Sequence, residues 1–179
     1  MQISSSANRA RFVAMHGLLL ALALVFSYLE AQIPVPIPIP GIKLGLANIV
    51  VAFCAYALSM RSAIAVSLLR VTVIAFLFGS ITSFFFSLLG ALFSLLTLAF
   101  LLRVFPSRLS PIGISALCAV MHNVGQLTAA AILLSTQAVI VYLPHMIAAA
   151  AATGTLTGIL LCMLLRAFPQ SKHNSRESV

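Results

Sequence analysis

The sequence predicts an all-α membrane protein, a bundle of six transmembrane helices, from its composition, its apolar runs and its charge distribution. Of the 179 residues, 62% are hydrophobic and only 7% are charged, whereas soluble domains carry about 25% charged residues. The apolar runs are continuous and do not alternate, which favours helices over a membrane β-barrel. This composition excludes a soluble enzyme, a disordered chain and, despite the net charge of +8, a nucleic-acid-binding domain.

Prolines, arginines and short polar turns divide the chain into its predicted helices. Each helix that crosses hydrocarbon needs about 20 apolar residues. The first run ends at the alternating prolines of 34–40, which cannot continue a helix, and it is expected to be a retained helix and not a signal peptide. The predicted spans are 12–33, 44–59, 62–80, 84–102, 111–134 and 138–165. They form one domain, 1–168, which is followed by a polar tail at 169–179.

Basic residues fall almost entirely on one side of the predicted membrane. With a cytoplasmic N-terminus, eight of the ten basic residues lie on the cytoplasmic side, Lys43 lies outside and Arg70 lies within a span. This bias is the positive-inside pattern of membrane proteins. It predicts that both the N- and C-termini are cytoplasmic.

The acidic residues and the cysteines restrict the chemistry. The chain has only two carboxylates, Glu30 and Glu177, and no Asp. A catalytic carboxylate pair in the membrane and an Asp-rich Mg²⁺ site are therefore excluded. Cys54, Cys118 and Cys162 lie in apolar runs and are expected to be reduced packing residues. The sequence thus predicts a protein that is not an enzyme and that holds no metal or cofactor.

Arg70 is the most informative polar residue because it lies midway along the third predicted helix. An arginine at this depth costs about 2.5–3.5 kcal/mol on insertion scales, and such residues are usually functional. Glu30 lies nearer the outer surface, at an axial distance of about 10 Å, so a direct pair would need a tilted helix or an intervening water. A neutral partner, a bound anion and a structural role are the alternatives.

The fifth predicted helix carries a second polar cluster at the same depth. His122 and Gln126 are one turn apart and share a face, and Asn123 lies between them. For any single polar residue, the alternative is an interhelical hydrogen bond worth about 0.6 kcal/mol. We expect one ligand cavity, open to the outside, to be lined by Lys43, Asn48, Arg70, His122, Asn123 and Gln126.

Small residues recur at helical spacing on three of the predicted helices. Ser87, Gly90 and Ser94 on the fourth and Gly154 and Gly158 on the sixth allow close approach of neighbouring helices in lipid, and internal packing is expected there. On the first helix, Gly17 and Ala21 are four positions apart, as Gly154 and Gly158 are on the sixth. Because the first helix begins the bundle, these two small residues are a candidate docking surface for another protein.

Four segments resemble the Gx transporter family, which is also labelled heptaprenyl diphosphate synthase component I. They are PGIKLGLANI at 40–49, LR at 69–70 followed by Gly79, GIS at 113–115 and HNVGQ at 122–126. The resemblance runs from about residue 10 to 166. One departure is that Cys118-Ala119 stands where the family usually has Gly-Ala.

The resemblance implies a fold similar to the substrate-binding (S) components of energy-coupling factor transporters, in the bacterial cytoplasmic (inner) membrane. Such proteins capture a vitamin or cofactor precursor and dock on a transmembrane coupling protein driven by two ATPases. The resemblance makes Gly17 and Ala21 the matching docking positions and 34–43 the matching lid. The chain has no phosphate-binding loop of its own, so ATP hydrolysis would come from partner subunits.

The synthase label conflicts with the composition of the chain. Prenyl diphosphate synthesis uses Mg²⁺ held by clustered aspartates, and the chain contains no Asp. The sequence therefore leaves two functions: a substrate-binding component of an uptake system, or a non-catalytic accessory or scaffold subunit of a redox or isoprenoid-quinone system. A solitary secondary transporter is less favoured because Glu30 is the only carboxylate within the predicted spans.

Reporter fusions test the predicted topology. Alkaline phosphatase fused at residue 41 should be active, because this loop is predicted to lie outside, whereas fluorescent-protein fusions at 107 and 168 should fluoresce in the cytoplasm. Cytoplasmic fluorescence from the fusion at residue 41 would contradict the predicted orientation.

Overall fold

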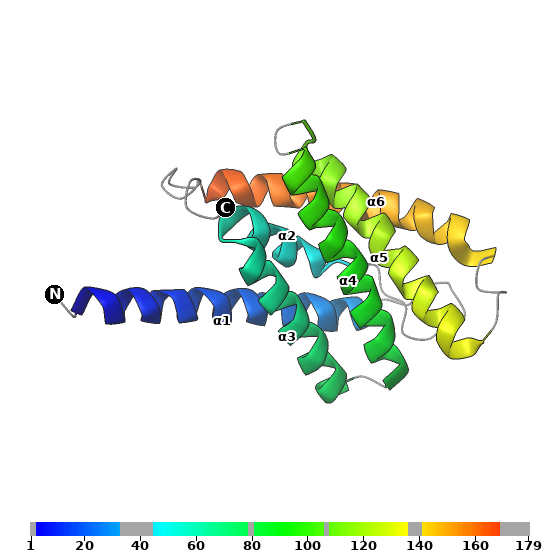
Figure 1. The fold of residues 1–179 in the computed structure, drawn as a ribbon, viewed down its shortest axis with the longest axis horizontal. Coiled ribbons are helices and arrows are strands. Elements are labelled where there is room, and N and C mark those ends of the chain that lie inside the picture. The colour runs from blue at the N-terminus through cyan, green and yellow to red at the C-terminus, as the bar shows by residue number, and fades with distance from the viewer. Residues whose placement is uncertain (1–2, 33–44, 79–80, 106–107, 136–140, 169–179) are drawn as a thin grey trace.

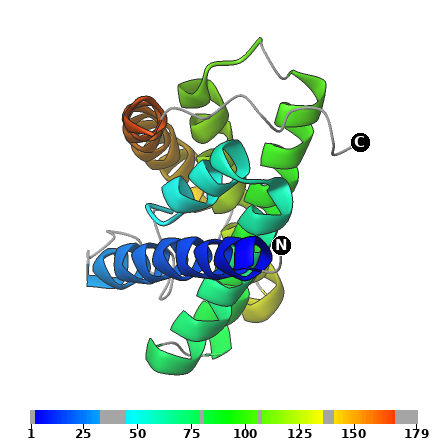
Figure 2. The same ribbon diagram turned by 90° about the vertical axis from the view of Figure 1, so that its left-hand side faces the viewer.

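The computed structural model describes residues 3–32, 45–78, 81–105, 108–135 and 141–168, in which six helices and no strand are present. Figures 1 and 2 show the helices packed in one bundle, with the beginning of α1 extending beyond the others. The predicted all-α fold is confirmed. The helices are α1 (Ile3–Gln32), α2 (Asn48–Ala57), α3 (Met60–Phe78), α4 (Ile81–Val104), α5 (Pro111–Leu134) and α6 (Leu143–Ala167).

Five of these helices, all except α2, are long and apolar enough to cross a membrane. The chain is therefore a multi-pass membrane protein. Helix α2 has only 10 residues, a length of about 15 Å, which is half the thickness of a bilayer core. The predicted second span, 44–59, is thus longer than the helix observed, and a sixth crossing stays a prediction.

The boundaries of α2 explain its short length. Gly45 precedes it with φ +85°, a left-handed conformation that glycine adopts without steric cost. The following residues form a turn in which Asn48 N donates to Gly45 O at 3.0 Å. At its other end, Leu58 leaves the helical conformation with φ −120° and ψ −82°. The helix therefore begins and ends inside the segment that the sequence predicted to span.

The helix ends that carry arginines gather at one end of the bundle. In Figure 1, the start of α1 lies at the left, the start of α3 and the end of α6 lie at the upper left, and the end of α4 and the start of α5 lie at the top. This arrangement agrees with the predicted concentration of positive charge at one membrane face. The assignment of that face to the cytoplasm stays a prediction.

Helix α5 is the centre of the packing, and glycines bring its neighbours close to it. A Cβ added at Gly125 would lie 2.5 Å from the Leu89 backbone oxygen of α4. On the other side, a Cβ at Gly154 of α6 would lie 2.7 Å from the Ala116 Cα. Such contacts are the means by which helices associate in lipid, so the predicted packing role of the small residues on α6 is observed.

Helix α1 is held much less closely than α5. Most of its side chains are exposed, and Gly17 has no atom within 4 Å of the position where a Cβ would stand. Large apolar side chains are also exposed on the other helices, for example Phe76 at 87% and Leu96 at 69%. A lipid-facing surface accounts for this exposure.

Alanine at Gly125 should destabilise the bundle by about 2 kcal/mol, because the added methyl group overlaps a backbone that cannot move without shifting a helix. Gly17→Ala is the matched control, since its methyl group enters open space. Thermal unfolding of the purified variants in detergent measures both effects. Equal stability of the two variants would contradict the proposed close contact between α4 and α5.

Candidate ligand site

The N-terminus of α2 lies inside the bundle. Ala47, just before the helix, is fully buried, and the Gly45 N–H donates a hydrogen bond to Glu30 Oε1 of α1. A helix N-terminus carries a partial positive charge. In membrane proteins, helices that begin at membrane depth commonly direct this charge at a bound anion. Here the first three amides of the helix donate to carbonyl oxygens of the preceding turn, and the Glu30 carboxylate accepts from Gly45 at the start of that turn.

Arg70 lies next to this helix start, near the middle of α3, and is only 5% exposed. Its Nη1 donates to Ser27 Oγ at 3.3 Å and its Nη2 to Asn48 Oδ1 at 3.5 Å. Both bonds are longer than a usual charge-assisted hydrogen bond. Its Nε has no hydrogen-bond partner among the described residues. The guanidinium is therefore deeply buried but incompletely satisfied.

Glu30 of α1 belongs to the same group of polar side chains. We call this group, which also contains Asn48, Arg70, His122 and Gln126, the polar layer. Glu30 is 2% exposed and lines one small cavity together with Arg70, Ser27, Ser87 and His122. The cavity measures about 10 Å³, which is close to the space that one water needs. The predicted axial separation of Glu30 from Arg70 thus does not prevent the two side chains from facing a common space.

His122 and Gln126 occupy the side of this layer formed by α5. Their side chains are hydrogen-bonded at 3.1 Å between Gln126 Nε2 and His122 Nε2, so the predicted shared face is observed. Gly90 of α4 provides the room, because a Cβ there would lie 2.8 Å from His122 Cε1. The glycine on α4 therefore fixes where the imidazole can lie.

One predicted ligand residue, Asn123, is not part of this cluster. Asn123 instead links α5 to α6, because its Nδ2 donates to the Met146 carbonyl oxygen at 2.9 Å. Its Oδ1 has no partner among the described residues. Lys43 and the predicted lid at 34–43 lie outside the described residues. The structure thus brings together Asn48, Arg70, His122 and Gln126.

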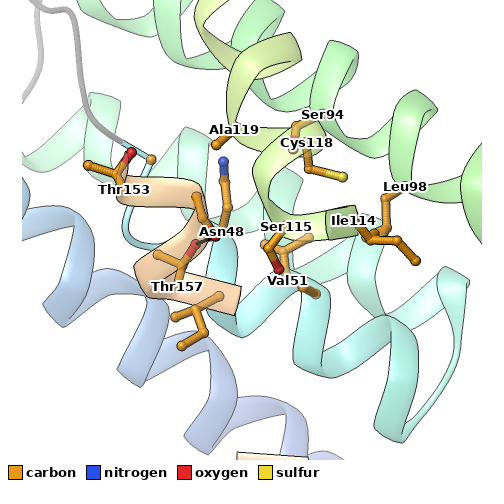
Figure 3. Close-up of a pocket in the computed structure, with 14 residues that line it drawn as sticks. Asn48, Val51, Ser94, Leu98, Ile114, Ser115, Cys118, Ala119, Thr153 and Thr157 are labelled. Atoms are coloured by element: carbon orange, nitrogen blue, oxygen red, sulfur yellow. Dashed lines mark hydrogen bonds between the residues drawn. The ribbon is translucent and has the colours of Figure 1, made fainter. Parts of the chain in front are cut away.

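A second polar cavity, of about 20 Å³, lies between α2, α4, α5 and α6. Figure 3 shows the Asn48 nitrogen extending between the Thr153 and Cys118 side chains. Sequence reasoning missed the threonines of α6 in this cavity. Thr153 and Thr157 are one turn apart beside the glycines of the same helix, and this spacing is the signal that could have identified them. The polar side chains that line it are Asn48, Ser94, Ser115, Thr153 and Thr157.

Neither polar cavity has the size that the sequence predicted for a ligand site open to the outside. Drug-sized ligands occupy pockets of about 300–1,000 Å³, whereas these two cavities measure about 10 and 20 Å³. Because Lys43 and the predicted lid at 34–43 lie outside the described residues, a larger cavity open to the outside stays a prediction.

A larger hollow of about 310 Å³ lies between α1 and α3, away from the polar layer. Gly17 lines it, and His16 contributes its only ionisable side chain among the described residues. His16 Nε2 is hydrogen-bonded to Ser62 Oγ at 2.8 Å. The remaining lining side chains are apolar: Phe12, Val13, Leu20, Ala65, Val66 and Leu69.

A sequence profile of the family described as heptaprenyl diphosphate synthase component I matches residues 19–164. The chain belongs to this family. The matched region includes every residue of the polar layer, which agrees with the resemblance carried by the motifs around Asn48, Arg70 and His122. No curated protein and no solved structure matches the chain.

The polar layer of this family member brings together groups that can bind an anion. It joins a guanidinium, a helix N-terminus, an imidazole and two carboxamides around Glu30, the one carboxylate among the described residues. Within those residues, no three His, Cys, Asp or Glu side chains gather as metal ligands. The groups present can donate to an anion and fix its orientation.

A double-mutant cycle tests whether Glu30 compensates the charge of Arg70. Glu30→Leu alone should cost about 3 kcal/mol or more, because it leaves a buried charge without compensation. Adding Arg70→Met should recover much of that loss, so the two effects should be strongly non-additive. Unfolding free energies in detergent provide the measurement, and additive effects would show that the two groups do not interact.

Proposed function

We propose that this protein is the substrate-binding membrane component of a cofactor- or vitamin-type uptake system, similar to the S components of energy-coupling factor transporters. The observation that carries the proposal is the half-length α2, which begins inside the bundle beside a buried arginine whose Nε has no partner among the described residues. In this proposal the chain is not an enzyme, and partner subunits hydrolyse ATP.

Energetics favour a ligand in this layer over a purely structural role. A buried polar atom without a hydrogen bond costs about 1–3 kcal/mol. Three such atoms occur in or next to the polar layer: Arg70 Nε, Asn48 Nδ2 and Asn123 Oδ1. A packing role alone would not require them. A ligand with anionic or carbonyl groups would satisfy the two donors.

A ligand needs more room than the two small cavities provide, and the packing indicates where that room can form. The cavities lie at the seam between α1–α3 on one side and α4–α6 on the other. Glycine contacts hold α4, α5 and α6 together closely, whereas α1 is mostly exposed. Movement of α1–α3 against α4–α6 would widen the polar layer at the cost of the contacts that Leu95 of α4 and Leu161 of α6 make with the apolar core of α1–α3.

The surface of α1 is consistent with docking on a coupling protein. Gly17 and Ala21 are both exposed, and Gly17 lines the hollow between α1 and α3. Small residues allow a partner helix to approach closely. The proposal therefore places the coupling protein on α1 and the ATPases on the cytoplasmic side, in a bacterial inner membrane.

The second candidate is a non-catalytic accessory or scaffold subunit of a redox or isoprenoid-quinone system. The family description, component I of a prenyl synthase, favours it because a numbered component implies another subunit. The apolar hollow of about 310 Å³ would also accept a lipid chain. A scaffold, however, does not explain the unsatisfied polar atoms at mid-depth.

Small molecules retained on purification test the proposal. The wild type should retain a compound that Arg70→Ala loses at least tenfold, because the buried guanidinium is its main anchor. Arg103→Ala is the matched control, since Arg103 is an exposed arginine at the end of α4, and it should retain the compound. Mass spectrometry of extracts from equal amounts of folded protein provides the measurement. Identical profiles for all three proteins would remove the ligand proposal.

The proteins that co-purify in mild detergent separate the two candidates. Recovery of coupling-type ATPases would support uptake, whereas recovery of a redox or prenyl-transfer enzyme without ATPases would support the accessory subunit.

A further inference from the structure

The cavity between α2, α4, α5 and α6 has a chemical character different from that of the Arg70 cavity. None of the described residues that line it is charged, and none is a histidine. Its polar groups are one carboxamide and four hydroxyls, from Asn48, Ser94, Ser115, Thr153 and Thr157. It is therefore suited to a neutral polar group and not to an anion.

The orientation of the Asn48 amide is determined by Arg70. A guanidinium only donates hydrogen bonds, so the Asn48 oxygen must be the atom that accepts from Arg70 Nη2. The amide nitrogen then extends toward the second cavity, as Figure 3 shows, and it has no hydrogen-bond partner among the described residues. Asn48 thus presents a free donor to this cavity.

The threonines of α6 present acceptors from the opposite wall. Thr153 Oγ1 donates its hydrogen to Ala149 O at 3.0 Å, and Thr157 Oγ1 donates to Gly154 O at 3.0 Å. Because each hydroxyl hydrogen is already used, the oxygens can offer only lone pairs to another group. The cavity therefore has a donor on the α2 wall and acceptors on the α6 wall.

We propose that this cavity is a second subsite that receives the edge of a neutral amide or imide, in which a carbonyl oxygen lies beside an N–H. The carbonyl accepts from Asn48 Nδ2, and the N–H donates to Thr153 Oγ1. At about 20 Å³ the cavity admits about one water-sized group, so the edge enters it once the seam has widened, and the rest of the ligand stays in the seam. This inference rests on the proposed function and defines its ligand class: an anionic group for Arg70 joined to a neutral amide or imide edge.

Two pairs of probes test the subsite: flavin mononucleotide with its N3-methyl derivative, and uridine monophosphate with its N3-methyl derivative. Each parent carries a phosphate and an imide edge, and methylation replaces the imide N–H with a bulkier N–CH3 group that cannot donate. Inorganic phosphate serves as the probe for the anion site alone. Affinities are measured by titration of the washed, full-length protein in detergent.

For at least one pair, the parent should bind about tenfold more tightly than its methylated derivative, which corresponds to one lost hydrogen bond. Thr153→Val should abolish this discrimination and leave phosphate binding unchanged. Thr155→Val is the matched control, because Thr155 is exposed on the same helix and its hydroxyl donates to Ala151 O at 2.7 Å. This control should retain the full discrimination.

Equal binding of parent and methylated probes, or no binding of any imide probe, would overturn the subsite. If phosphate still bound and depended on Arg70, the proposed function would stand without the subsite. Loss of all binding, together with identical retained molecules in wild type and Arg70→Ala, would overturn both proposals.

Discussion

The buried guanidinium of Arg70 is the constraint on which the rest of the polar layer depends. A charge at mid-depth must be compensated, and the compensation comes from two other helices: Ser27 and the nearby carboxylate of Glu30 on α1, and Asn48 at the start of α2. The bond from Gly45 N–H to Glu30 ties the start of α2 to the same layer. One cation therefore organises the meeting point of α1, α2 and α3.

The other half of the bundle is organised by steric fit and not by charge. Glycines on α4, α5 and α6 remove the side chains that would separate these helices, and His122 lies in the space that Gly90 leaves. The polar layer is thus a seam between three helices joined by close backbone contact and three helices joined by an apolar side-chain core, which Leu95 of α4 and Leu161 of α6 also enter. In our account, this difference in packing is what allows the seam to open for a solute while the bundle stays folded.

The sequence was sufficient for features that follow from composition and periodicity. Continuous apolar runs predicted the helices, and helical spacing placed His122 and Gln126 on one face, as observed. The short α2 could not be predicted, because the apolar run continues past both ends of the helix, whose limits are set by the backbone conformations of Gly45 before it and Leu58 after it. The second cavity was missed because Thr153 and Thr157 bond within their own helix, and a sequence does not show which face of that helix meets Asn48.

The Nε–H of Arg70 offers the most direct measurement of the central claim. Its ¹⁵N–¹H NMR signal can be assigned by its loss in Arg70→Lys and followed while the compound retained on purification is removed and added back. Our account predicts that this signal shifts on rebinding, because the ligand supplies the partner that Nε lacks among the described residues. A signal that stays unchanged while the compound binds would show that the buried guanidinium is structural and that the solute, if any, is recognised elsewhere.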